Sequence, residues 1–249
     1  MNLFNYFYLY LAYGIALLSW HLYSSYVQPA IETNRDTKDF KYPWLEFVFA
    51  LLAAIATILV GQLYMKGLLF SRSSSFGFLT ESINQLLIFS PFPLLLIIRK
   101  HRLSTAWFPT KGKIKSIAIG LVIAMIALVV LLLLKGRSSM LLADIGFIYS
   151  YKNLPQLVQV FAEDFAISVC LFRLMAWIGA KRAILLISLL FAASHIPAML
   201  YNDVALGDFT GLLFDALLGF FALTVVSKSK NFLWFWMIHY AMDMTQFLN

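Results

Sequence analysis

Five polar residues that can do chemistry lie inside long apolar stretches of the sequence. Glu163 and Asp164 are adjacent in "FAEDFAISVCLFR" (161–173), His195 ends "FAASH", and His239 opens "HYAMD", with Asp243 four residues further on. Residues i and i+4 of a helix share a face, so His239 and Asp243 are expected to point the same way. The polar residues lie at similar depths along three different apolar stretches, which indicates one shared site. The alternative is that each residue forms a separate helix–helix hydrogen bond.

These residue types suggest a hydrolase. A buried carboxylate beside a second acid could act as a general base and deprotonate a water. One histidine could help to hold that water, and the other, aimed by its own carboxylate, could donate to a developing oxyanion. The same side chains could instead bind zinc, although the chain lacks the HExxH helical signature. Cys170 is interpreted as a core residue and not as a nucleophile.

The composition is that of a membrane protein. The 249 residues are 61% hydrophobic and 12% charged, with a mean hydropathy of +0.81, whereas a soluble domain is about half apolar and a quarter charged. The net charge of +7 comes from basic residues in short loops between apolar stretches, so membrane topology explains it better than a nucleic-acid partner. A single cysteine excludes a disulfide framework.

Eight stretches are long and apolar enough to cross a bilayer, which takes about 20 residues. Backbone groups cannot stay unpaired in lipid, so each stretch should be a helix. The expected fold is therefore an all-α, polytopic bundle of about eight transmembrane helices in one membrane domain, residues 1–249. The third stretch contains "SPFP" (90–93), whose two prolines should kink or end its helix. The expected spans are 3–27, 44–66, 76–98, 114–134, 154–178, 180–200, 209–226 and 231–248.

Basic residues predict the orientation. Fourteen Lys and Arg lie in the loops near 28–42, 99–115, 173–182 and 227–230, and five lie on the other side. The basic side should face the cytoplasm, which puts both termini outside. The first stretch has no basic n-region and no cleavage site near its end, so it is interpreted as a retained span. The expected location is the plasma membrane of a bacterium or archaeon.

Other polar residues lie within or beside the spans, and four of them could line a substrate path: His21, Glu46, Glu81 and Asp215. Arg173 is interpreted as an anchor that snorkels to the cytoplasmic surface. Glu46 is interpreted as an interfacial residue, and Glu81 and Asp215 as groups that form bonds inside the bundle. His21 belongs to the same set, and none of these residues is predicted to be catalytic.

The three polar blocks resemble those of the CPBP intramembrane peptidases, a family that includes type II CAAX prenyl endopeptidases and bacteriocin-processing or immunity proteins. The family pattern is EExxxR, then FxxxH, then HxxxN or HxxxD. In this chain "EDFAIS" (163–168) stands for the first block, "FAASH" (191–195) matches the second, and "HYAMD" (239–243) matches the third. The likeness covers roughly residues 155–248, the expected catalytic core, whereas residues 1–150 resemble the family only in being helical.

The resemblance implies a role for each matching residue. Glu163 would activate the water, His195 would help to bind the water or the substrate, and His239 with Asp243 would stabilise the oxyanion. Phe191 would pack beside the site. Family members are described as glutamate-dependent without an obligatory metal, so no cofactor and no metal are expected.

The first block departs from the family pattern at two positions. Asp164 is shorter than the family's second glutamate, and Ser168 stands where the family has an arginine. That arginine would be an ion-pair partner at i+4 from Asp164, and Arg173, about 13 Å further along the axis, cannot replace it. Asp164 is therefore expected to be protonated, or bonded to Ser168 or to a group from the first 150 residues.

Three functions are open on this reading. The first is an intramembrane endopeptidase that cuts a membrane-anchored protein or peptide precursor near its outer end, because the predicted orientation puts the site in the outer half of the bilayer. The second is a catalytically silent scaffold of the same fold that holds a membrane partner, which the loss of the motif arginine at Ser168 would explain. The third is a transporter with a proton relay, although the paired discontinuous helices typical of transporters are not evident. The bilayer is the other expected partner, and the sequence leaves the oligomeric state open.

Overall fold

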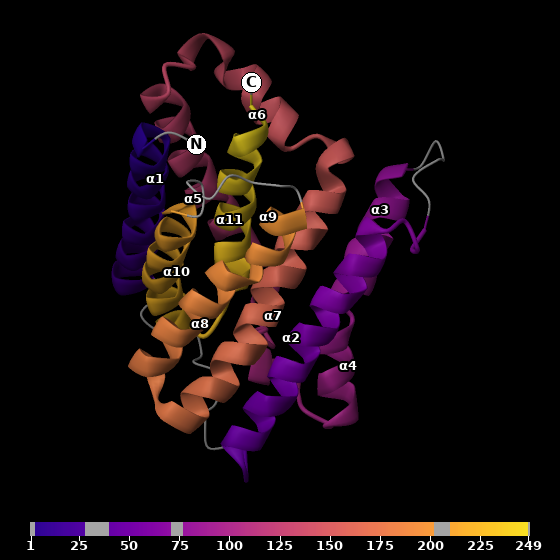
Figure 1. Ribbon diagram of the computed structural model, residues 1–249. Coiled ribbons are helices and arrows are strands. Elements are labelled where there is room, and N and C mark those ends of the chain that lie inside the picture. Colours follow the sequence, from indigo (N-terminus) through magenta and orange to yellow (C-terminus); the bar gives the residue numbers. More distant parts are fainter. Residues whose placement is uncertain (1–2, 28–39, 71–76, 202–209, 249) are drawn as a thin grey trace.

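The chain folds into a bundle of helices, which confirms the predicted all-α class (Figure 1). The computed structural model describes residues 3–27, 40–70, 77–201 and 210–248, and no strand occurs among them. The α-helices are α1 Leu3–Leu22, α2 Pro43–Met65, α3 Gly77–Phe89, α4 Pro91–Ile98, α5 Lys113–Leu134, α6 Leu141–Ile148, α7 Leu154–Ile178, α8 Ala180–Ser194, α9 Ile196–Tyr201, α10 Thr210–Ser229 and α11 Leu233–Met244.

Several helices have the length and apolarity of a membrane span. Within the described ranges these are Pro43–Met65, Lys113–Leu134 and Gly211–Ser229, and the bent pair α3–α4 adds a fourth. The number of eight spans stays a prediction, since other helices are shorter or more polar than expected. The last predicted span, 231–248, is an α-helix only over Leu233–Met244 and ends in a 3-10 turn, Thr245–Phe247.

The predicted break in the third stretch is confirmed. Helices α3 and α4 meet at an angle of 49°, with Ser90 between them and Pro91 in the first turn of α4. Proline fits the first helical turn but cannot donate a backbone hydrogen bond within a helix. The bend therefore follows from the "SPFP" segment.

Helix α7 is the centre of the bundle. It contacts α2 and α3 on one side and α8 and α11 on another, and Figure 1 shows it passing between these pairs. Because it carries the two adjacent acids, every helix that packs on α7 limits where their side chains can point.

Helix α11 is held against α5 by an unusually close approach. A Cβ atom at Gly120 of α5 would lie 2.2 Å from the backbone oxygen of Trp234, so only glycine fits there. The Trp234 ring is fully buried and stacks on Trp20 of α1 with ring centroids 4.1 Å apart. Asn231, just before α11, donates to the Ser116 hydroxyl of α5 over 2.8 Å. These contacts fix the axial position of α11.

Arg173 is not the surface anchor that the sequence suggested. Its side chain is fully buried and donates to the carbonyl of Val169 at 3.0 Å and to Nδ1 of His101 at 3.1 Å. Its guanidinium also lies over the Phe40 ring, 5.2 Å from the centroid. The segment after α4 supplies His101 and the Thr105 carbonyl, and Phe40 precedes α2, so a snorkelling arginine would not meet these partners.

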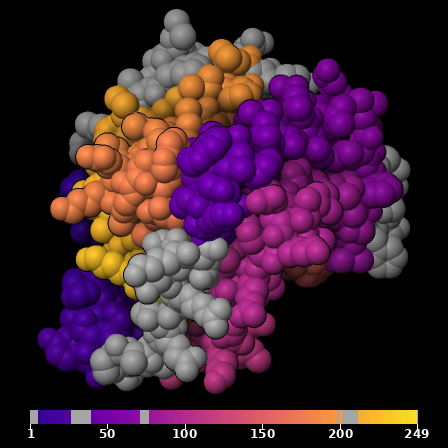
Figure 2. Space-filling view, turned by 90° about the horizontal axis from the view of Figure 1, so that it is seen from below, coloured from indigo at the N-terminus to yellow at the C-terminus, as the bar shows by residue number. Residues whose placement is uncertain are grey.

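Glu46 is likewise buried within the bundle. It is 5% exposed and accepts a hydrogen bond of 2.6 Å from Arg99 at the end of α4. Seen from below, the start of α2 lies between the α7–α8 turn and the segment that follows α4 (Figure 2). At the end of the bundle that was predicted to face the cytoplasm, buried charged groups thus join neighbouring helices to one another.

The close contact at Gly120 can be tested with one methyl group. We expect Gly120→Ala to lower the melting temperature of the detergent-solubilised protein, because α5 and α11 must separate; overpacking of this kind costs about 1–3 kcal/mol. Gly14→Ala is the matched control, since a Cβ at this mid-helix glycine of α1 meets nothing within 4 Å. Equal melting temperatures for the two variants would show that the predicted clash is relieved without cost.

Candidate active site

The two adjacent acids of α7 point in different directions, because successive helical residues are about 100° apart. Asp164 is 4% exposed, whereas Glu163 is half-buried. Glu163 Oε1 accepts a hydrogen bond of 2.8 Å from the Gln159 amide, one turn earlier on the same helix. Glu163 is therefore the more accessible of the two carboxyl groups and has a neutral donor beside it.

His239 of α11 binds to Asp164 and not primarily to Asp243. Its Nδ1 lies 2.9 Å from Asp164 Oδ1, a hydrogen-bond distance, whereas its Nε2 lies 4.0 Å from Asp243 Oδ1. The i,i+4 spacing places Asp243 on the correct face, as expected, but Nδ1 of the ring faces α7. Asp164 Oδ2 has no hydrogen-bond partner among the described residues.

His195 lies at the C-terminal end of α8, and its side chain is exposed. Its Nδ1 is 3.0 Å from the Phe191 carbonyl, so an N–H at this nitrogen would donate there and leave Nε2 free to face a ligand. The Phe191 ring contacts both imidazoles, with centroids 5.0 Å from His195 and 6.5 Å from His239. Phe191 thus packs at the edge of both histidines.

The structure brings the predicted residues of three helices into one electrostatic neighbourhood. Glu163 on α7 interacts with His195 on α8 and with His239 and Asp243 on α11. Phe235, one turn before His239, packs on its ring with centroids 5.7 Å apart. An acid and two imidazoles therefore lie near one another in a partly buried setting.

Two further residues of this neighbourhood come from helices outside the three motif blocks. Asp215 of α10 interacts electrostatically with His195 and Asp243, and Tyr13 of α1 interacts with Asp164, Asp215 and Asp243. The acid in an apolar span was a signal for Asp215. Nothing in the sequence distinguished Tyr13 from the other aromatic residues of α1.

Ser168 and Cys170 take no evident part in this arrangement. Ser168 is 3% exposed, and no hydrogen bond joins it to Asp164 in the described structure. Cys170 is buried within the apolar core of the bundle. A search of the described residues for three or more His, Cys, Asp or Glu side chains placed to hold a metal ion finds no such group.

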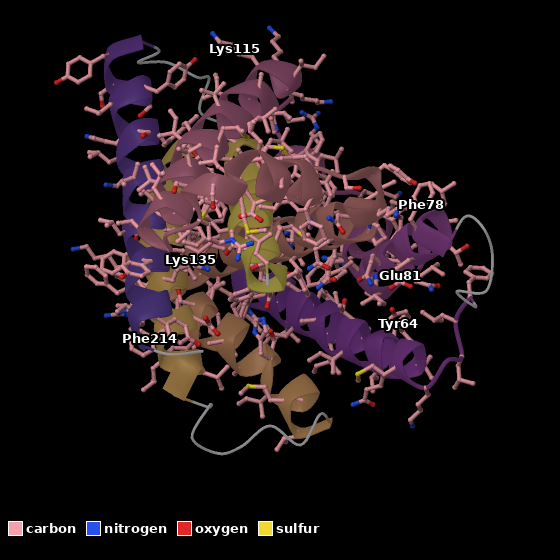
Figure 3. All side chains as sticks on the ribbon, turned by 90° about the horizontal axis from the view of Figure 1, so that it is seen from above. Tyr64, Phe78, Glu81, Lys115, Lys135 and Phe214 are labelled. Atoms are coloured by element: carbon pink, nitrogen blue, oxygen red, sulfur yellow. The ribbon has the colours of Figure 1, made fainter. Side chains whose placement is uncertain are left out.

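An open cavity of about 940 Å³ lies between α2, α3 and the first turns of α7, and its lining ends at Gln159, one helical turn before Glu163. Its lining includes the side chains of Gln85, Gln156 and Gln159, and the last of these is the residue that donates to Glu163. Figure 3 shows Tyr64, Phe78 and Glu81 grouped on α2 and α3 at this edge of the bundle. Glu81 accepts hydrogen bonds from the Tyr64 hydroxyl and from the Gln85 amide.

Comparison with known proteins finds one relationship. Residues 154–245 match the family described as type II CAAX prenyl endopeptidase Rce1-like. Neither the curated proteins nor the solved structures that were compared gave a match. The match begins at α7 and ends just after α11, so it contains the three motif blocks and excludes α1 to α6. Residues 154–245, which are less than half of the chain, are therefore similar to the CPBP family.

Proposed function

We propose that the chain is an intramembrane endopeptidase that hydrolyses a peptide bond with water activated by Glu163. The observation that carries this proposal is the grouping of Glu163 with His195 and His239 from three helices. The match of residues 154–245 to a family named for prenyl endopeptidases supports the reaction class. An acid–imidazole cluster within the membrane-spanning helices of a bundle is costly, and such groups are usually functional.

The proposed reaction needs no covalent intermediate. Glu163 takes a proton from a bound water, and the water oxygen forms a bond to the scissile carbonyl carbon. The carbonyl π electrons move to oxygen, and the oxyanion accepts a hydrogen bond from an imidazole. The C–N bond then breaks, and the proton held by Glu163 passes to the leaving nitrogen.

The geometry favours different roles for the two histidines. His239 lies between two carboxylates, Asp164 at Nδ1 and Asp243 nearer Nε2. It can therefore carry a proton on both nitrogens and donate from Nε2 to the oxyanion. His195 is exposed and bound only to the Phe191 carbonyl, so it is assigned to hold the water or the substrate.

Asp164 takes the position of the family's second acid but has a different partner. Ser168 replaces the arginine, and Arg173 is bound to the segment after α4 instead. In this chain the imidazole of His239 supplies the hydrogen bond that the arginine would give. A catalytically silent scaffold is the second candidate, favoured by the absent arginine and by the partnerless Oδ2 of Asp164.

The proposed substrate is a membrane-anchored protein or peptide precursor that is cut near its outer end. The orientation predicted from basic residues puts the end of α11 and the start of α7 in the outer half, with both chain ends outside. A prenylated tail in the cytosol would approach from the opposite side.

Replacing Glu163 tests the catalytic proposal directly. We expect Glu163→Gln to lower cleavage by about 10²–10⁴-fold, because the amide cannot take the proton. The readout is the mass of protein termini in membrane and secreted fractions of the native host. Cys170→Ala is the control and should cleave normally. Identical termini in the wild type and the Glu163→Gln variant would leave only the scaffold function.

The hydrogen bond at His239 predicts unequal effects of the two neighbouring aspartates. We expect Asp164→Asn to lower kcat by about 10²-fold or more, a loss typical of an oxyanion donor, because the neutral amide no longer stabilises a doubly protonated His239 ring and can turn an N–H donor toward Nδ1, where Asp164 accepts over 2.9 Å. Asp243→Asn should cost less than about tenfold, since this carboxylate lies beyond hydrogen-bond distance. Both rates are measured on a protein whose terminus differs between the wild type and the Glu163→Gln variant. A larger loss for Asp243→Asn would reverse the assignment.

The orientation is tested with a tag after Asn249. We expect an added C-terminal cysteine to react with a membrane-impermeant maleimide in intact cells, while a cysteine at Lys181, in the predicted cytoplasmic turn, reacts only after lysis. Both are placed in the Cys170→Ala background. The opposite labelling pattern would put the substrate on the cytoplasmic side.

A further inference from the structure

We propose that the cavity between α2, α3 and the start of α7 binds an extended segment of the peptide substrate, held by hydrogen bonds from its main chain to the amides of Gln85, Gln156 and Gln159. This inference rests on the proposed peptidase function and assigns the site that carries the chain to Glu163. None of the three glutamines belongs to a motif block.

The glutamines have unused hydrogen-bonding capacity. A glutamine amide offers two N–H donors and an oxygen with two lone pairs. Gln159 uses one donor on Glu163, and Gln85 uses one on Glu81. Gln156 makes no side-chain hydrogen bond to a described residue. All three line the cavity, so their remaining groups are available to a ligand there.

An unwound peptide in a membrane needs such partners. A helical substrate satisfies its own backbone, but a peptide bond that is to be attacked must leave the helix and exposes unpaired N–H and C=O groups. Each unpaired group in an apolar setting costs several kcal/mol. Amides beside the catalytic carboxylate would replace the lost hydrogen bonds and stabilise the unwound form.

The spacing of polar side chains along α7 suits an extended peptide. Gln156, Gln159 and Glu163 follow one another at intervals of three and four residues, so they lie along one face of the helix. Gln156 and Glu163 are about 10 Å apart along the axis, which is the length of about three residues in an extended chain. A main chain bound at Gln156 would therefore present a carbonyl to Glu163 about three residues later.

The charge of the lining also favours a peptide over a lipid. The lining contains one acidic side chain, Glu81, and one basic side chain, Lys152. A phosphate headgroup would need a cluster of basic groups, and a prenyl or acyl chain would leave three amides unpaired. The neutral, polar main chain matches both the charge and the hydrogen-bonding groups.

Photocrosslinking tests the occupant of the cavity. In a Glu163→Gln background, p-benzoylphenylalanine replaces Tyr151, an exposed lining residue 5.4 Å from the Phe78 ring. The control position is Leu142 of α6, which is 83% exposed and does not line the cavity. After irradiation of intact cells, adducts are identified by mass spectrometry. We expect peptide adducts at position 151 whose parent proteins are those with termini altered by Glu163→Gln.

The glutamines are tested in the same assay. Replacing Gln85 and Gln156 together by Leu should lower the adduct yield at position 151 by about tenfold, the effect of losing one or two hydrogen bonds. Replacing both by Asn retains the amides and should preserve most of the yield. Gln62→Leu, on the exposed surface of α2, is the control. The melting temperature of each variant checks that the bundle is intact.

The outcomes separate this inference from the proposed function. Lipid adducts alone, or peptide adducts that the Leu pair does not reduce, would overturn the inference even if Glu163→Gln alters protein termini. Amide-dependent peptide adducts without any altered terminus would support the cavity as a peptide site and leave the peptidase proposal contradicted.

Discussion

The hydrogen bond between Asp164 and His239 joins α7 and α11, two of the three helices that carry the polar groups of the site. It lies where both partners are largely removed from water, with 5% and 12% of their side chains exposed. An unpaired charge would be costly in this buried position, so each residue lowers the free-energy cost of burying the other. The same bond fixes the rotation of α11 relative to α7, which brings His239 near Glu163.

That bond depends on packing far from the polar groups. The contact between Gly120 and Trp234 sets how closely α11 approaches α5, and the stacked Trp20 adds α1 to the same assembly. Trp236 donates to the carbonyl of Leu157 on α7 over 3.0 Å, two turns before the acids. Helix α11 is thereby positioned from both sides, so a shift there would separate His239 from Asp164.

Sequence patterns predicted the long apolar helices well, because hydrophobicity and proline act locally: α7 begins and ends where expected, and the chain bends at "SPFP". They failed where a residue's partner is distant in the chain. Arg173 looked like an anchor because its contacts, His101 and Thr105, lie about 70 positions earlier. The i,i+4 rule indicated which face of α11 holds His239, but not which carboxylate its Nδ1 would meet.

The two ends of the bundle are built differently, and this difference bears on how a substrate could enter. At one end, Glu46 and Arg99 pair, and Arg173 is buried beneath the segment after α4, so charged hydrogen bonds tie α2, α4 and α7 together. Opening the helices there would leave charges unpaired. At the other end, a cavity between α2, α3 and the first turns of α7 is lined by three neutral amides together with one acid and one base. A peptide that entered there would exchange amide–water for amide–peptide hydrogen bonds and would break no ion pair of the closed end, so the proposed substrate would reach Glu163 by this end at a lower cost in free energy.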